Sequence, residues 1–298
     1  MRKSWPSMPA PDSNSTFAAN AKKALVSLDP RPGVNKPDPI IVAQGIKRSF
    51  GGLTAVDVDQ MQVQRHSITA LIGPNGAGKT TLFNLLTGFD RAQNGSWKFN
   101  TTEISKMPPH KIARLGMVRT FQLTKSLYRL SVMDNMRLAA TQQRGESIFI
   151  SPLRPIWRNQ EKEITERAES LLERFKLIDK KDDFAAALSG GQRKLLEMAR
   201  ALMVNPEIVM LDEPMAGVNP ALKQSLLGHI RSLRDDGMTV LFVEHDMDMV
   251  RDISDWVVVM AQGQIVAEGE PHEVMRDQAV IDAYLGAHHD MSLEAEDR

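Results

Sequence analysis

The segment GPNGAGKT, residues 73–80, combines the residue types that bind a triphosphate. It matches the pattern G-x4-G-K-S/T, in which glycines let backbone N–H groups wrap the phosphates. Lys79 would reach the β and γ oxygens, and the Thr80 hydroxyl would bind Mg²⁺. A glycine turn without a ligand is the alternative, but the segment follows a predicted strand and opens a predicted helix, which favours a P-loop. We predict that the ligand-binding residues here are Gly73, Pro74, Asn75, Gly76, Ala77, Gly78, Lys79, Thr80 and Thr81.

A second glycine pair lies in LSGGQ, residues 188–192. Ser189 and Gln192 have the spacing of a capping box, which satisfies N–H groups at a helix start. Each glycine in a helix costs roughly 1 kcal/mol relative to alanine. A cap alone therefore explains the serine but not Gly190 and Gly191, and we expect a ligand or another surface to approach them closely.

Acidic and imidazole side chains follow two apolar runs. Asp212 and Glu213 end the run 208–211, where they could simply emerge at the surface. With a P-loop present, Asp212 would hold Mg²⁺ through water and Glu213 would orient or deprotonate the attacking water. His245 is a lone histidine and could be structural, but it follows a second buried run, where ligand crevices of α/β proteins lie. There it could sense the γ-phosphate.

Two further stretches are ambiguous. Phe50 precedes Gly51 and could be core, or an exposed ring on which a base stacks. Such stacking would discriminate poorly between ATP and GTP. The stretch NKPD, residues 35–38, matches a guanine-reading motif, but it precedes the P-loop in a proline-rich segment, so we interpret it as accidental.

The elements that must position these residues are readable from apolar patterns. Residues 67–73, 207–214 and 237–246 are continuous apolar runs that suit parallel strands buried on both faces. A helix should run from Lys79 to Leu86. The sequence thus predicts an α/β fold with a mainly parallel core sheet.

Smaller parts surround that sheet. Alternating residues 39–64 predict an N-terminal antiparallel β lobe, and residues 256–269 predict a hairpin around Gln262-Gly263. Between about 120 and 190 there is no clear strand, and the amphipathic segment 161–177 predicts a helical lobe. Residues 140–160 read as an insertion, which we interpret as a surface loop.

Composition bounds the remaining possibilities. The 298 residues carry no formal net charge and have a pI near 7.1, which gives no pull toward nucleic acid. There is no cysteine, and no apolar run approaches the roughly 18 residues of a membrane span, so we expect a soluble chain. Residues 1–39 hold seven of the sixteen prolines and are expected to be a disordered leader, with 287–298 as a flexible tail.

Taken together, the P-loop, Gln122, LSGGQ, IVMLDEP (208–214) and His245 resemble the motifs of ABC ATPases in order and spacing over residues 40–286. The resemblance implies ATP and Mg²⁺ as cofactors. It also implies three catalytic residues: Glu213, His245 as the switch histidine, and Gln122 as the Q-loop residue that touches Mg²⁺ or water. Phe50 would be the aromatic residue that stacks on the nucleotide base. In this family two domains pack head to tail. Ser189, Gly190, Gly191 and Gln192 would then bind the ATP held by the P-loop of the opposite subunit.

Within the family, the chain is similar to ATP-binding subunits of branched-chain amino acid importers. The similarity rests on SFGGLTAVDVD (49–59), RTFQ (119–122), AGVNP (216–220), EHDMDMV (244–250) and VIDAYLG (280–286). Asn219 replaces the aspartate that most ABC ATPases carry, which we interpret as a subtype feature.

This similarity implies integral membrane permease subunits as partners, a second ATPase subunit (paralogue or self), and indirectly a solute-binding protein. The chain would then be peripheral at the cytoplasmic face of the inner membrane. The alternatives are the ATPase of an exporter such as the lipopolysaccharide type, or a soluble ABC ATPase of DNA repair or translation. An ABC ATPase of DNA repair or translation would need features that this sequence does not show, such as a coiled-coil insertion or a basic stripe.

Overall fold

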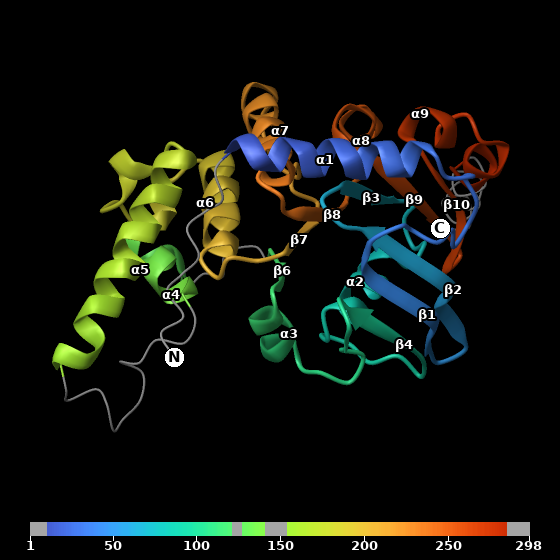
Figure 1. Ribbon diagram of the computed structural model, residues 1–298, viewed down its shortest axis with the longest axis horizontal. Helices are drawn as coiled ribbons and strands as arrows, with labels where there is room; N and C mark the ends of the chain where they lie inside the picture. The colour runs from blue at the N-terminus through green and yellow to red at the C-terminus, as the bar shows by residue number, and fades with distance from the viewer. Residues whose placement is uncertain (1–10, 121–126, 141–153, 285–298) are drawn as a thin grey trace, which may run out of the picture.

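The computed structural model describes the backbone of residues 11–120, 127–140 and 154–284. Two sheets meet in one lobe, and a group of helices forms a second lobe beside them (Figure 1). The α/β architecture predicted from the sequence is confirmed.

The larger sheet has six strands in the order β10-β9-β3-β8-β7-β6. Neighbouring strands from β9 to β6 are parallel, and β10 pairs antiparallel with β9 as the predicted hairpin. The strands are β3 (Ile68–Ile72), β6 (Met117–Arg119), β7 (Ile208–Asp212), β8 (Thr239–Val243), β9 (Trp256–Ala261) and β10 (Gln264–Gly269).

The apolar runs form this sheet because both of its faces are buried. Alternate residues of one strand enter two different cores: Val209 and Leu211 face the core shared with the helical lobe, whereas Ile208 and Met210 face the core under the smaller sheet. The same division holds for β3, β8 and β9. Strands buried on both sides read as continuous apolar sequence rather than as alternation.

The smaller sheet is antiparallel, with strand order β2-β1-β4-β5, and confirms the N-terminal β lobe. Its strands are β1 (Pro39–Phe50), β2 (Leu53–Gln64), β4 (Asn94–Phe99) and β5 (Thr102–Glu103). Between this sheet and the larger one lies α2 (Lys79–Leu86), which buries Leu82, Phe83, Leu85 and Leu86.

The helical lobe lies at one side of the larger sheet and contains α4 (Val132–Ala139), α5 (Arg154–Arg174) and α6 (Gly190–Leu202) (Figure 1). Residues 154–160 are helical, so the predicted surface loop over 140–160 is wrong for that part, and residues 141–153 lie outside the described chain. Further α-helices are α3 (Pro109–Leu115), α7 (Pro220–Asp235), α8 (Met247–Ile253) and α9 (Pro271–Val274).

The prediction of a disordered leader is wrong over residues 11–38. Residues Pro11–Val26 form α1, which packs against α7 and buries Leu25 completely (Figure 1). Later in the leader, Lys36 forms a nearly fully buried ion pair with Glu268, with 2.8 Å between Lys36 Nζ and Glu268 Oε2. The Lys36 ammonium also lies 4.6 Å from the Trp256 ring centroid. Composition could not reveal this docking, since Lys36 and Glu268 are 232 positions apart.

The same network accounts for the NKPD stretch. Asn35 accepts hydrogen bonds from Gln60 and Gln62, and the Glu268 carboxylate also accepts from Val34 N–H and Trp256 Nε1. Through these contacts Val34, Asn35 and Lys36 connect the leader to β2 and to the β9–β10 hairpin. The predicted tail 287–298 lies outside the described residues. Among the described residues, no helix is both long and apolar enough to cross a bilayer.

Candidate functional site

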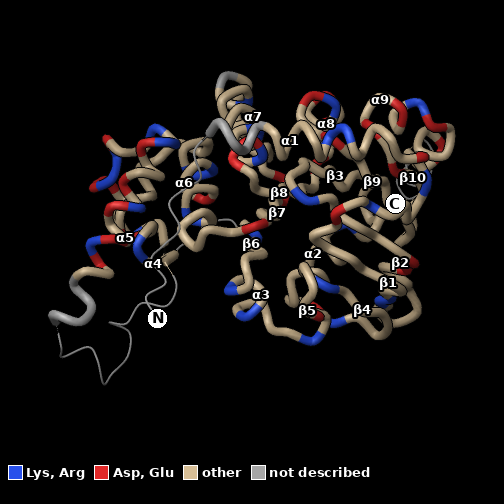
Figure 2. Tube along the Cα trace, in the orientation of Figure 1, with Lys and Arg blue, Asp and Glu red and all other residues tan. Residues whose placement is uncertain are grey.

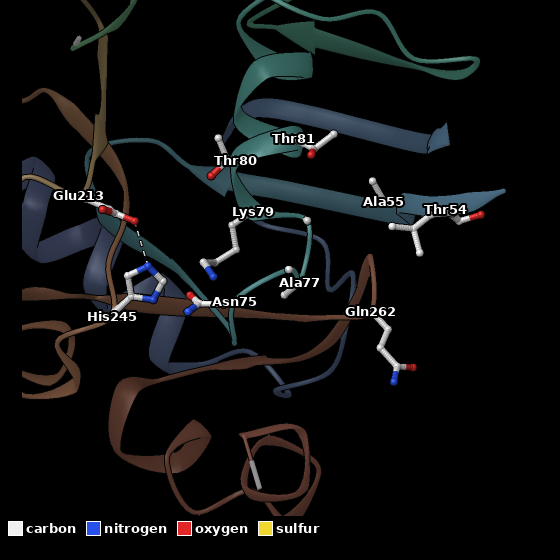
Figure 3. Close-up of a pocket in the computed structure, with 13 residues that line it drawn as sticks. Thr54, Ala55, Asn75, Ala77, Lys79, Thr80, Thr81, Glu213, His245 and Gln262 are labelled. Atoms are coloured by element: carbon white, nitrogen blue, oxygen red, sulfur yellow. Dashed lines mark hydrogen bonds and ion pairs between the residues drawn. The ribbon is translucent and has the colours of Figure 1, made fainter. Parts of the chain in front are cut away.

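The predicted catalytic segments meet at one edge of the larger sheet. Strands β3, β8 and β7 are neighbours and parallel, so their carboxyl ends lie side by side. These ends carry the P-loop, the pair Glu244-His245 and the pair Asp212-Glu213. A cleft of about 580 Å³ opens there, a size typical of small-molecule sites (Figure 3). Its lining residues are Leu53, Thr54, Ala55, Asn75, Gly76, Ala77, Gly78, Lys79, Thr80, Thr81, Glu213, His245 and Gln262.

Two glycines of the P-loop are required by neighbouring backbone. A Cβ at Gly73 would lie 2.1 Å from the carbonyl oxygen of Met260, and one at Gly78 would lie 2.1 Å from that of Ala55. Both residues also have positive φ, at 148° and 97°. The loop is therefore pressed between β2 and β9, which fixes its shape before any ligand arrives.

The rest of the loop is open toward the cleft. Gly76 has φ 79° and no heavy atom within 4 Å of the position of a Cβ. Helix α2 begins at Lys79 without a side-chain cap, and its first residues, Lys79, Thr80 and Thr81, line the cleft. An uncapped helix start behind an open glycine loop fits a phosphate chain.

Lys79 lies in this cradle with only 6% of its surface exposed. Its ammonium donates to the carbonyl oxygens of Gly73 and Pro74, at 2.7 and 2.8 Å. Burial lowers the pKa of Lys79, and the negative charge of Glu213 acts in the opposite direction. A phosphate placed in the loop would give this desolvated cation an anionic partner.

Glu213 and His245 form a pair across the cleft, with 3.0 Å between Glu213 Oε1 and His245 Nε2 (Figure 3). The Glu213 backbone has φ 45°, a conformation that non-glycine residues rarely adopt and that is often found at functional sites. The Glu213 N–H donates to Val243 O, which ties the residue to β8. The two side chains are 47% and 43% exposed, so within one chain this pair remains open to water.

Asp212 is not among the residues that line that cleft. It lines a small neighbouring cleft beside Lys194 and Glu197, and its Oδ2 accepts a hydrogen bond from Arg119 Nη2 at 2.5 Å. Arg119 also donates to Asn84 Oδ1 at 2.6 Å. Sequence patterns gave no role to Arg119 or Asn84. The Mg²⁺-binding role of Asp212 stays a prediction.

The aromatic prediction is only partly met by the geometry. Phe50 is 49% exposed, but it is not among the residues that line the cleft, and the Arg48 guanidinium lies 4.3 Å from its ring centroid. Leu53, Thr54 and Gln262 line that side instead. Gln262 belongs to the β9–β10 turn, which contacts the loop through a hydrogen bond from Gly263 N–H to Ala77 O. The sequence predicted this turn but not that Gln262 lines the cleft.

The LSGGQ segment does not reach the cleft of its own chain. Ser189 caps α6 in a complete capping box, as predicted: its Oγ accepts from Gln192 N–H and its N–H donates to Gln192 Oε1. Ser189 and Gly190 are exposed at the helix start. None of the segment's residues is among those that line the cleft.

The two glycines differ in their surroundings. A Cβ at Gly191 would lie 1.7 Å from Leu222 Cδ2 of α7, whereas one at Gly190 would be 3.6 Å from Gly217 O, an ordinary contact. Part of the glycine pair is therefore explained by packing within the chain, which the sequence did not suggest. Only Gly190 leaves open surface. Gln122 lies outside the described residues.

The fold and the cleft together define a P-loop nucleotide-binding protein of the α/β class. Residues 56–216 match the ABC transporter family. Residues 264–290 match the family of branched-chain amino acid ATP-binding cassette transporters. The chain belongs to the ABC transporter family of ATP-binding proteins.

Relatives and solved structures are similar over most of their length. A probable branched-chain amino acid transport ATP-binding protein, LivG of Archaeoglobus fulgidus, is 43% identical over 83% of this chain and 96% of its own. The high-affinity branched-chain amino acid transport ATP-binding protein BraF of Pseudomonas aeruginosa is 41% identical over 83% and 98%. An ATP-binding cassette of an ABC transporter in its ADP conformation superposes with a TM-score of 0.74 at 38% identity, over 83% of this chain and 99% of that one. The predicted ABC ATPase fold is thus confirmed.

Proposed function

We propose that this chain is the ATP-hydrolysing subunit of an importer for branched-chain amino acids or related small solutes. The observation that carries the proposal is the cleft in which the open P-loop faces the Glu213–His245 pair. The solute class is supported by the relatives' names and by the match over residues 264–290. These relatives do not favour the exporter or the non-transport alternative.

In this function, Lys79 and the loop N–H groups bind the β- and γ-phosphates. Thr80 and, through water, Asp212 would hold Mg²⁺, which neutralises charge on the phosphate oxygens when bound. Glu213 accepts a proton or a hydrogen bond from the attacking water, and His245 holds the Glu213 carboxylate in position at 3.0 Å. Gln122 would complete this catalytic set.

Two exposed surfaces support a site shared between two ATPase subunits. The Glu213–His245 pair is nearly half exposed, although phosphoryl transfer benefits from a site that excludes water. The LSGGQ helix start is exposed on the same chain but away from its own cleft. A second subunit, paralogue or self, would place its Ser189 and Gly190 over the ATP of the first.

The partners then follow from the transport role. Permease subunits in the membrane would hold this chain at the cytoplasmic face, and a solute-binding protein would act through them. Figure 2 shows Lys and Arg positions interspersed with Asp and Glu positions along the trace of both lobes, and in this view the described part of the chain has no continuous basic stripe of the kind that nucleic acid requires.

Nucleotide binding tests the proposal most directly. Lys79→Ala should weaken MgATP binding measured by calorimetry, because a charge-assisted contact to phosphate is lost. The exposed Lys23→Ala is the control and should bind as the wild type does. Equal affinity in all three proteins would contradict the phosphate site, and failure to co-purify with integral membrane proteins from the source membranes would contradict the transport role.

A further inference from the structure

Arg119 joins the two elements that carry the proposed Mg²⁺ residues. Its guanidinium donates to Asp212 Oδ2 at the end of β7 and to Asn84 Oδ1 on α2, at 2.5 and 2.6 Å. Asn84 lies four residues after Thr80, one helical turn along the same face of α2. One side chain therefore spans from the Asp212 carboxylate to the helix that presents the Thr80 hydroxyl.

Arg119 is itself held rigidly. Its strand pairs in parallel with β7, and the next residue, Thr120, donates its N–H to Met210 O at 2.9 Å. The side chain is only 6% exposed, and its guanidinium carbon lies 5.6 Å from the Phe83 ring centroid. A planar guanidinium presents its donors in a fixed fork, so two simultaneous bonds define both distance and direction.

We propose that Arg119 is a positioning residue that fixes Asp212 relative to Thr80, and so sets the geometry in which Mg²⁺ is bound with ATP. A carboxylate has about four lone-pair sites, so the bond from Arg119 leaves Asp212 able to accept from a metal-bound water. Partners that orient a metal-binding side chain act on metal affinity without touching the metal. This inference rests on the proposed function, since it assumes that Thr80 and Asp212 serve Mg²⁺.

The experiment first compares ATP binding to the wild type with Mg²⁺ and with EDTA, by calorimetry. Tighter binding with Mg²⁺ is expected. If ATP binds equally well under both conditions, the proposed Mg²⁺ site itself is absent, and the inference falls with it.

Arg119→Met then tests the positioning role. This variant should lose about tenfold or more of the Mg²⁺-dependent gain, the lower end for removing a partner of a metal-binding residue, while ATP binding in EDTA stays unchanged. The Mg²⁺-dependent gain of Arg119→Lys should lie between that of the wild type and that of Arg119→Met, because one ammonium cannot hold both partners in the same fork.

Arg174→Met is the matched control. Arg174 pairs with Asp236 at 2.5 Å and is also largely buried, at 17% exposure, but it joins α5 to the end of α7. The two Met variants should have comparable melting temperatures without nucleotide. A Mg²⁺-dependent gain in Arg119→Met that equals or exceeds that of the control would overturn the inference, as would equal weakening of ATP binding with Mg²⁺ and with EDTA.

Discussion

Single residues in the cleft divide the work between binding and chemistry. Lys79 and the glycine loop are shaped for phosphate, whereas Glu213 stands at the opposite wall in a rarely adopted backbone conformation. Such conformations cost on the order of 1–3 kcal/mol and persist where the surroundings enforce them. Here the bond from Glu213 N–H to Val243 O is part of that enforcement.

Replacing Glu213 should therefore separate the two roles. Glu213→Gln keeps the shape and the loop contacts but cannot accept a proton, so we expect MgATP affinity near that of the wild type and turnover at least about 10²-fold slower. Single-turnover hydrolysis and calorimetry measure the two quantities. A variant that hydrolyses ATP at nearly the wild-type rate would exclude Glu213 as the catalytic carboxylate.

Much of this site could be predicted from residue types and spacing. The P-loop, the start of α2 at Lys79 and the capping box at Ser189 are local features, because spacing and hydrogen bonds within a few residues define them. Arg119, Gln262 and the contact of Gly191 with Leu222 could not be predicted in this way. Each depends on which distant segment lies opposite, and no local pattern encodes that.

At the scale of elements, the start of α6 meets α7 on one side and open surface on the other. Alanine at either Gly190 or Gly191 would gain up to about 1 kcal/mol of helix propensity. Gly191→Ala should nevertheless be the less stable of the two variants, because its Cβ collides with Leu222. Gly190→Ala should leave the stability unchanged or raise it, yet should lower hydrolysis by the assembled ATPase pair, since that surface would face the partner's ATP.

Urea unfolding and ATPase assays distinguish these effects. Leu222→Ala in the Gly191→Ala background should restore part of the lost stability, which shows as non-additivity in a double-mutant cycle. Equal unfolding free energies for Gly190→Ala and Gly191→Ala would contradict the packing explanation.

The leader is held by several contacts, of which the buried ion pair between Lys36 and Glu268 is one. Lys36→Met should lower the free energy of unfolding by about 3 kcal/mol, because the buried Glu268 carboxylate is left without its cation. The double variant Lys36→Met/Glu268→Gln should recover only part of that loss, because the glutamine amide has one acceptor oxygen for the N–H groups of Val34 and Trp256 that both bind Glu268. Lys23→Met, at an exposed position of α1, is the control and should change little. If Lys36→Met unfolds at the same urea concentration as the control, the ion pair contributes nothing to docking.

At the scale of the whole molecule, the proposed shared site predicts complementation between inactive chains. Lys79→Ala damages the P-loop half of a site and Ser189→Arg damages the LSGGQ half. Each alone should be inactive, but a mixed pair has one site with both halves intact, so mixing should restore hydrolysis. If the natural partner is a paralogue, the two changes are divided between this chain and that paralogue. No recovery in either format would contradict a shared site.

The order of strands in the larger sheet also determines when this sheet can form during translation. β3, which leads into the P-loop, pairs with β8 and β9, whose residues follow it by about 170 positions or more. Ribosomes add about 5–20 residues each second, so β3 waits on the order of 10–40 s for its neighbours. During translation the nascent chain therefore exposes an apolar strand without partners and cannot yet bind nucleotide. Chaperone contact should fall in that interval, and ATP should begin to protect the nascent chain from proteolysis only after the β9–β10 hairpin has left the ribosome.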